Sequence, residues 1–161
     1  MIYGYVYYKI GIIMAGFMIG LAAGSFWANR RPSADPYGFL TKIQVLVCCY
    51  PLLLIAILYF YSTASEGFLR LTEPVFGFLP VIAGLMGGLQ YPHANRIFPE
   101  RSTKTAKVAG LTYGVDLFGS CLGALITASI LLPVLGVYQT CFAAAIINLL
   151  ALGGLVASRT K

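Results

Sequence analysis

One acidic residue lies well inside a long apolar stretch of the sequence. Asp116 belongs to residues 111–136, LTYGVDLFGSCLGALITASILLPVLG, a stretch long enough to cross a bilayer. Counting from Lys107 at about 1.5 Å per residue puts Asp116 roughly 13 Å along a helix, near the middle of the membrane. An ionised carboxylate costs about 2.5 to 3.5 kcal/mol there. We therefore expect Asp116 to face other helices and to be paired or protonated.

Three further polar side chains are candidates to meet this carboxylate. Asn148 lies about 16 Å from the basic end of its own helix, a comparable depth, and Gln90 and Tyr113 are the other plausible donors. Two interpretations stay open. Asp116 either makes an interhelical hydrogen bond that fixes packing, or it binds a cation or a proton, because lone intramembrane acids often mark pathways.

A histidine and a basic run lie together at the end of another apolar stretch. His93 is the single histidine of the chain, so it cannot supply both axial ligands of a haem. We predict that this region contacts lipid headgroups at the membrane interface. The candidate headgroup residues are His93, Arg96, Arg101, Lys104 and Lys107.

No motif for catalysis or cofactor binding is present. The four cysteines have no CxxC spacing, and the sequence contains no Rossmann or P-loop fingerprint, no HExxH and no GxSxG. We predict no metal site, no cofactor and no enzymatic activity in this chain. The net charge of +6 sits at helix ends rather than in aromatic-interleaved patches, which argues against nucleic-acid binding.

The composition predicts the elements that hold these residues. Hydrophobic residues make up 59% of the chain and charged residues 10%, values typical of membrane proteins. We predict an all-α polytopic membrane bundle that forms a single transmembrane domain over residues 1–161. The expected helices are about 5–27, 43–61, 75–91, 108–132 and 138–157, separated by loops at 28–42 and 62–74, a break at 90–93 and a tight corner from Pro133 to Gly136.

The distribution of Lys and Arg predicts the orientation of this bundle. Nine basic residues fall in the loops after the first and third helices and in the C-terminal tail, against only Lys9 and Arg70 on the other side. By the positive-inside rule the N-terminus is outside and the C-terminus cytoplasmic. A bacterial inner membrane is the expected location. Such an N-terminus without a leader is expected if helices that once preceded it were lost or belong to another chain.

Glycines recur every fourth residue on several of the expected helices. This spacing produces a smooth stripe that lets another helix approach closely. The predicted packing glycines are Gly16, Gly20, Gly24, Gly84, Gly88, Gly119 and Gly123.

Several stretches, taken in order, resemble a known family. YGYVYYKIGIIMAGFMIGLAAGSFWANR, GLMGGLQYPHANR, YGVDLFGSCLGALITASILLPVLGVYQT and AAIINLLALG together are similar to the membrane domain of spermidine synthase-like transmembrane proteins. In that family a helical domain, distantly similar to major facilitator transporters, precedes a soluble aminopropyltransferase-type domain. Asp116, Gly119 and Gly123 match the family's Tyr-x-x-Asp-x-x-Gly-x-x-x-Gly pattern, and Gln90 with Pro92 match its Gly-x-Gln-aromatic-Pro. The catalytic domain and the preceding helices of the family are absent from this sequence.

Three functional hypotheses follow. The first is a non-catalytic membrane subunit that packs by glycine faces against other membrane subunits or copies of itself and scaffolds or anchors a larger complex. The second is a transport module, half of a facilitator-like carrier for a polyamine or another cation, with Asp116 as its binding carboxylate. The third is the membrane part of a split enzyme with a soluble aminopropyltransferase-like partner.

Overall fold

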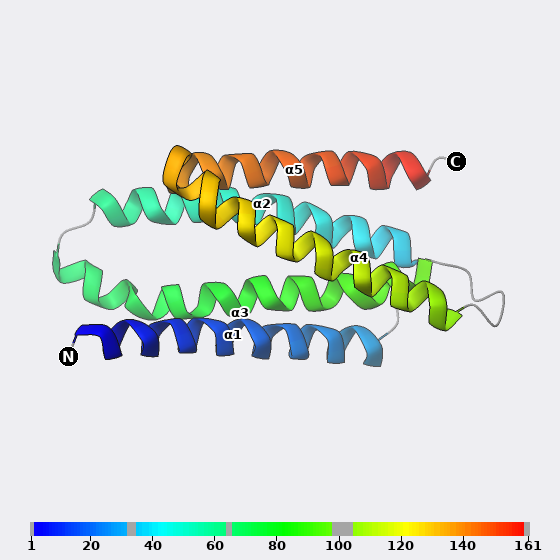
Figure 1. Cartoon of the computed structure of the whole chain (residues 1–161), viewed down its shortest axis with the longest axis horizontal. Helices are drawn as coiled ribbons and strands as arrows, with labels where there is room; N and C mark the ends of the chain where they lie inside the picture. Colours follow the sequence, from blue (N-terminus) through cyan, green and yellow to red (C-terminus); the bar gives the residue numbers. More distant parts are fainter. Residues whose placement is uncertain (1, 32–34, 64–65, 98–104, 160–161) are drawn as a thin grey trace.

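Long helices account for nearly all of the structure. This computed structural model describes residues 2–31, 35–63, 66–97 and 105–159. Its helices are α1 (Ile2–Arg30), α2 (Pro36–Thr63), α3 (Glu66–Ile97), α4 (Thr105–Ile126) and α5 (Gly136–Arg159), with a π-helical segment η1 (Thr127–Leu135) between the last two. Successive helices run in opposite directions, so the two termini lie at opposite ends of the bundle (Figure 1).

Three of the described segments are long and apolar enough to cross a membrane. They are Tyr7–Arg30, Pro36–Thr63 and Gly110–Ser158, and the last of these covers most of α4, all of η1 and most of α5. Large apolar side chains along them are exposed, Ile19 at 65% and Leu150 at 71% for example. A soluble monomer rarely exposes such a surface, whereas lipid covers it in a bilayer. The all-helical bundle is therefore of the kind that integral membrane proteins form.

The helices are longer than the sequence analysis predicted, because residues placed in loops extend their ends. The predicted loop at 28–42 is mostly helical, since α1 continues to Arg30 and α2 begins at Pro36. Asp35 starts α2: its side-chain Oδ1 accepts a hydrogen bond from the Gly38 N–H at 3.0 Å. An Asp N-cap followed by Pro at the first helical position is a strong helix start, and it outweighs the polar composition of the stretch. The predicted loop at 62–74 is likewise shortened, because α3 begins at Glu66.

The predicted break at residues 90–93 does not occur. Helix α3 passes through Pro92 and ends at Ile97. Proline has no N–H, so the carbonyl of Gly88 four residues earlier loses its helical donor. Ser25 of α1 supplies a replacement, since its Oγ donates to the Gly88 carbonyl at 3.2 Å. A neighbouring helix thus satisfies the freed acceptor, as membrane helices with internal prolines require.

The corner before α5 forms at a glycine. Pro133 lies inside η1 rather than in a loop, and the chain reverses at Gly136, which has a φ of 79°. Only glycine adopts this left-handed region at little cost. The Gly136 N–H donates to the Leu132 carbonyl and closes the π-helical segment.

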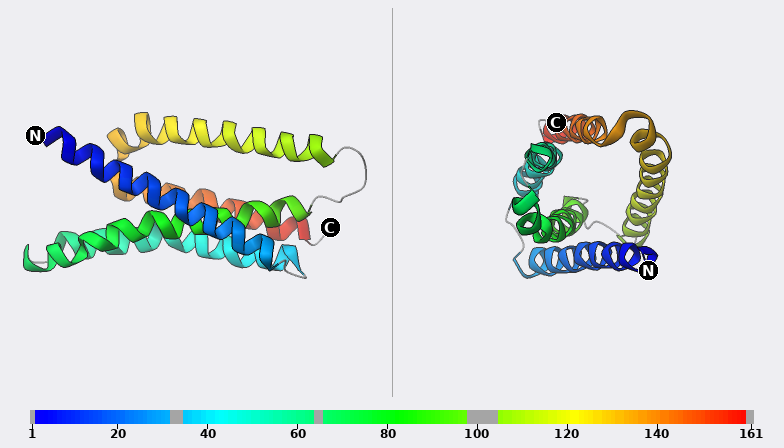
Figure 2. Two further views of the ribbon diagram at one scale, coloured as in Figure 1. Left: turned by 90° about the horizontal axis from the view of Figure 1, so that it is seen from below. Right: turned by 90° about the vertical axis from the view of Figure 1, so that its left-hand side faces the viewer.

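Packing among the helices is uneven. The most extensive interface joins α1 to α3, followed by those of α2 with α5 and of α2 with α3. Within the described residues, α4 makes a smaller interface, and it makes it with η1, the segment that follows it in the chain. The end-on view shows α4 forming a separate side of the bundle (Figure 2).

Candidate functional site

Glycines close the interface between α1 and α3. A methyl group added at Gly20 would overlap the carbonyl oxygen of Val81 and lie 2.9 Å from the backbone nitrogen of Leu85. The same holds in reverse, because a methyl group at Gly84 would overlap the Phe17 carbonyl. Gly24 and Gly88 face the partner backbone equally closely, and Gly16 touches the Val81 side chain. We call these five glycines the α1–α3 seam. Along the seam, the backbone of one helix fills the space that a side chain of the other helix would need.

The glycines of α4 have a different environment. No atom lies within 4 Å of a Cβ added at Gly119 or Gly123, once the helix's own backbone is left out. Both residues are exposed, as are most of the described side chains of α4. The structure therefore brings together the predicted packing glycines of α1 and α3, and leaves those of α4 without a neighbour inside the described chain.

A chain of amide side chains links α3, α2 and α5. The Gln90 Nε2 donates to the Gln44 Oε1 at 2.7 Å. The Gln44 Nε2 is placed between two acceptors of Asn148, the backbone oxygen at 3.2 Å and Oδ1 at 3.3 Å. Asn148 in turn donates from Nδ2 to the Ala144 carbonyl at 2.9 Å. This amide chain, made of Gln44, Gln90 and Asn148, stabilises three helices against one another, since each group satisfies a polar atom that lipid cannot satisfy.

The two candidate residues on α4 lie apart from the amide chain. Tyr113 makes an edge-to-face contact with Tyr91 of α3, with ring centroids 6.5 Å apart and planes at 78°. Asp116 and Ser120 follow Tyr113 by three and seven residues, so all three lie on one stripe of α4. Tyr113 gives this stripe a contact with α3 at one end. Asp116 itself is exposed, and none of the contacts described above joins it to Gln90 or Asn148.

The basic end of the bundle holds the candidate headgroup residues. His93 is not on the surface: it is 1% exposed, and its ring stacks on Phe39 with centroids 4.2 Å apart. The exposed Arg96 donates to the Ala28 carbonyl at 3.3 Å and to the Asn29 Oδ1 at 3.4 Å, which ties the end of α3 to the end of α1. Arg101, Lys104 and the side chain of Lys107 lie outside the described residues.

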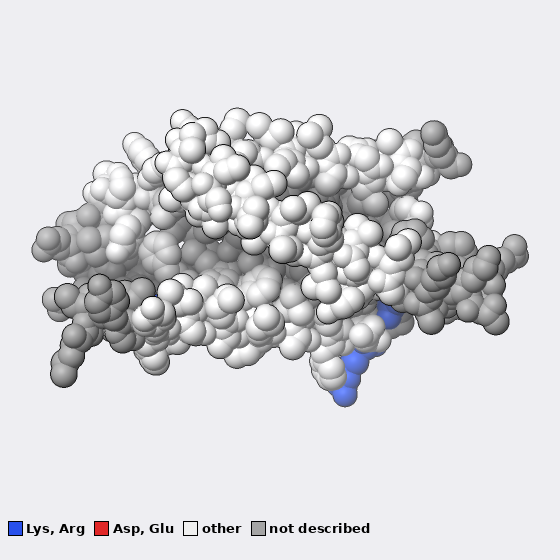
Figure 3. Space-filling model, in the orientation of Figure 1, with Lys and Arg blue, Asp and Glu red and all other residues white. Residues whose placement is uncertain are grey.

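Charge is confined to one end of the visible face. Figure 3 shows blue atoms only where α1 ends, and no red atom among the residues that are coloured. Arg30 and Arg31 belong to this end. The rest of the coloured surface on this face is uncharged, as a lipid-facing surface should be.

Sequence reasoning did not identify Gln44, the central member of the amide chain. A signal for it exists, because Gln44 is the single amide within the apolar residues 43–61. It also did not identify Ser25 as the donor that satisfies Gly88, or Phe39 as the ring that covers His93. These roles depend on which helices are neighbours, and spacing along one helix does not reveal that.

A metal-binding cluster is not found in the described part of the chain. No group of three His, Cys, Asp or Glu residues there lies close enough to hold a metal ion. The four cysteines are free thiols.

Comparison with family models, with curated proteins and with solved structures finds no match. The resemblance to spermidine synthase-like membrane domains therefore stays a prediction.

Proposed function

We propose that this chain is a non-catalytic integral membrane subunit that scaffolds or anchors a larger complex, and that α4 is its docking helix. The supporting observation is the contrast between two sets of glycines. The α1–α3 seam is filled by backbone, whereas Gly119 and Gly123 face open space. Glycines four residues apart suit the close approach of a second helix. A transmembrane helix of another subunit is the occupant we assign to this stripe.

The proposed topology has five crossings, made by α1, α2, α3, α4 with η1, and α5, in a bacterial inner membrane. Two observations support it. The helices alternate in direction, and the ends of α1, α3 and α5 share one end of the bundle (Figure 1). Arg30, Arg31 and Arg96 lie at that end. The positive-inside rule makes it cytoplasmic, with the N-terminus on the outside.

Affinity purification in mild detergent tests the docking proposal. The chain is isolated from its native membrane, and bound proteins are identified and quantified by mass spectrometry. We expect other membrane subunits in fixed ratio, and we expect Gly123→Leu to remove at least about nine-tenths of them, because a bulky side chain blocks backbone approach. Gly114→Leu is the matched control: it lies nine residues earlier, on the opposite side of α4, and has equally open space around it.

The outcomes separate the hypotheses. Loss of partners in Gly123→Leu but not in Gly114→Leu supports docking through the glycine stripe. Equal retention in both variants, or recovery of the chain alone, contradicts it. Recovery as a homo-oligomer that Gly123→Leu dissociates reassigns the occupant to a second copy of this chain.

A transport module is the second candidate function. It is favoured by the amide chain inside the bundle and by the polar stripe of Tyr113, Asp116 and Ser120, whose Tyr113 contacts Tyr91 of α3. By the rise per residue, Asp116 lies roughly 13 Å and Asn148 about 16 Å from the basic ends of their helices, which are comparable depths. A carboxylate at that depth suits the binding of a polyamine ammonium or a proton.

Uptake of a radiolabelled polyamine into vesicles that contain the chain tests this alternative. Asp116→Asn keeps the shape of the side chain and removes its charge. A fall in uptake of at least about tenfold, with partner binding unchanged, would support transport. Uptake equal to that of the wild type, or no uptake by either protein, would exclude it. A soluble aminopropyltransferase-like protein among the purified partners would instead support the split-enzyme hypothesis, which rests on the family resemblance.

A further inference from the structure

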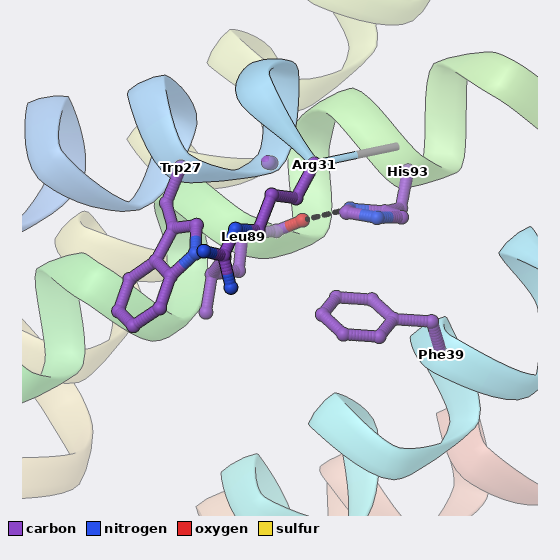
Figure 4. A pocket seen from close by; sticks show the side chains of 6 residues that line it. Trp27, Arg31, Phe39, Leu89 and His93 are labelled. Carbon is purple, nitrogen blue, oxygen red and sulfur yellow. Dashed lines mark hydrogen bonds between the residues drawn. The ribbon is translucent and has the colours of Figure 1, made fainter. Parts of the chain in front are cut away.

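A cavity of about 310 Å³ opens at the basic end of the bundle, where three helices meet. Its lining comes from the end of α1, the start of α2 and the end of α3 (Figure 4). The lining residues are Trp27, Ala28, Arg31, Phe39, Leu89 and His93. Most of these side chains are apolar, and Arg31 is the one charged residue among them.

His93, which lines the cavity, has a buried ring nitrogen without a hydrogen-bond partner among the described residues. Its Nδ1 lies 2.9 Å from the Leu89 carbonyl, which can only accept, so Nδ1 carries the proton and donates. In this tautomer of the imidazole, Nε2 is an acceptor. Nε2 is buried and has no hydrogen-bond partner within the described structure. A buried acceptor without a donor is unfavourable, so a donor that reached it would stabilise this arrangement.

The position and charge of the cavity limit what can occupy it. It lies at the end of the apolar segment Tyr7–Arg30, with the exposed Trp27 in the last turns, which is the usual depth of an aromatic belt. Three cations lie at this end: Arg30, Arg31 and Arg96. The acid described near them is Asp35, whose carboxylate caps the start of α2. An amphiphile with an anionic head fits these surroundings better than a neutral or cationic one.

We propose that this cavity binds the headgroup of an anionic phospholipid that carries a hydroxyl group, of which phosphatidylglycerol is the simplest. The Arg31 guanidinium pairs with the phosphate, Trp27 and Phe39 cover the glycerol and the first acyl carbons, and the headgroup hydroxyl donates to His93 Nε2. Because Trp27 and Arg31 are exposed, both can move aside as the headgroup enters and bring its hydroxyl within reach of Nε2. This site is independent of the docking proposed for α4.

The chain contains a single tryptophan, and Trp27 lines the cavity, so tryptophan fluorescence reports on the site directly. The purified chain is reconstituted in phosphatidylcholine vesicles, and brominated lipids that quench Trp27 are added in competition. The probes are brominated phosphatidylglycerol, phosphatidylmethanol, which has the same charge but no hydroxyl, and phosphatidylcholine. We expect phosphatidylglycerol to bind about tenfold more tightly than phosphatidylcholine, with phosphatidylmethanol between them.

Two variants and a matched control separate the contributions. Arg31→Gln should reduce the preference for both anionic lipids about fivefold. His93→Phe, which keeps an aromatic ring over Phe39, should abolish the difference between phosphatidylglycerol and phosphatidylmethanol. Arg30→Gln is the control, since this neighbouring guanidinium lies 4.7 Å from the Phe26 ring centroid and does not line the cavity.

Three results would overturn the proposal. Equal affinity for phosphatidylglycerol and phosphatidylcholine would show that the cavity does not select anionic lipid. The same loss in Arg30→Gln as in Arg31→Gln would show that surface charge alone attracts the lipid. Protection of Trp27 from the brominated lipids by millimolar glycerol phosphate would reassign the site to a soluble phosphate ester. If His93→Phe fails to fold, Arg31→Gln at the exposed rim still decides among these results.

Discussion

The α1–α3 seam and helix α4 carry similar glycine patterns but stand in opposite environments. Along the seam, Gly20 and Gly84 face the partner helix so closely that a single methyl group would meet backbone. On α4, Gly119 and Gly123 face open space. A glycine stripe therefore predicts that a helix can approach, but it does not say whether that helix belongs to the same chain. The docking proposal rests on this contrast, and four substitutions test the packing on which it depends.

The largest effect is expected at the centre of the seam. Gly20→Leu forces a side chain into the Val81 and Leu85 backbone, which cannot move without separating the helices. We expect a loss of about 3 kcal/mol or more in unfolding free energy. Thermal unfolding of the detergent-purified protein measures it, with Gly11→Leu on the same helix as the control because nothing lies within 4 Å of that site. Equal stability of the two variants would show that α1 does not pack on α3 through these glycines.

A smaller loss is expected in the amide chain. Gln44→Leu leaves the Gln90 Nε2 and the Asn148 Oδ1 without the partners they have now. We expect unfolding free energy to fall by about 2 kcal/mol. The exposed Gln139→Leu on α5 serves as the control and should change little. If both variants lose the same stability, the effect comes from removing an amide from any helix rather than from this network.

The Ser25–Gly88 hydrogen bond, which replaces the donor lost at Pro92, should contribute less to the free energy of unfolding. Ser25→Ala leaves the Gly88 carbonyl without its donor, and we expect a cost of about 1 kcal/mol. Ser120→Ala on the exposed surface of α4 is the matched substitution. Chemical denaturation in mixed micelles measures the unfolding free energy of both variants. A neutral Ser25→Ala would mean that water satisfies Gly88 equally well.

The smallest effect on the isolated chain is expected at α4. Gly123→Leu meets no atom in the described chain, so its unfolding free energy should change by less than about 0.5 kcal/mol. The same variant is expected to lose its partners during purification. A large loss of stability in the isolated chain would instead mean that α4 packs internally, which would remove the contrast with the seam.

The helical class of the fold and its membrane character could be predicted from the sequence, because apolar length and composition are local properties. It located the reversal near Gly136, where a positive φ favours glycine. Helix ends were harder to predict from the sequence. The start of α2 depends on the hydrogen bond from the Gly38 N–H to the Asp35 side chain, which outweighs the polar composition of this stretch. The five crossings, their orientation and the family resemblance stay predictions.

Which polar groups meet could not be predicted from the sequence. Gln90, Tyr113 and Asn148 were the predicted candidates to meet Asp116. The amide chain instead joins Gln90 to Asn148 through Gln44, while Tyr113 contacts Tyr91 and Asp116 lies exposed on α4. Periodicity fixes which residues share one face of a helix, but the rotation and neighbours of that helix depend on packing against all the others. The burial of His93 could not be predicted for the same reason, because it depends on the packing of α2, which carries Phe39, against α3.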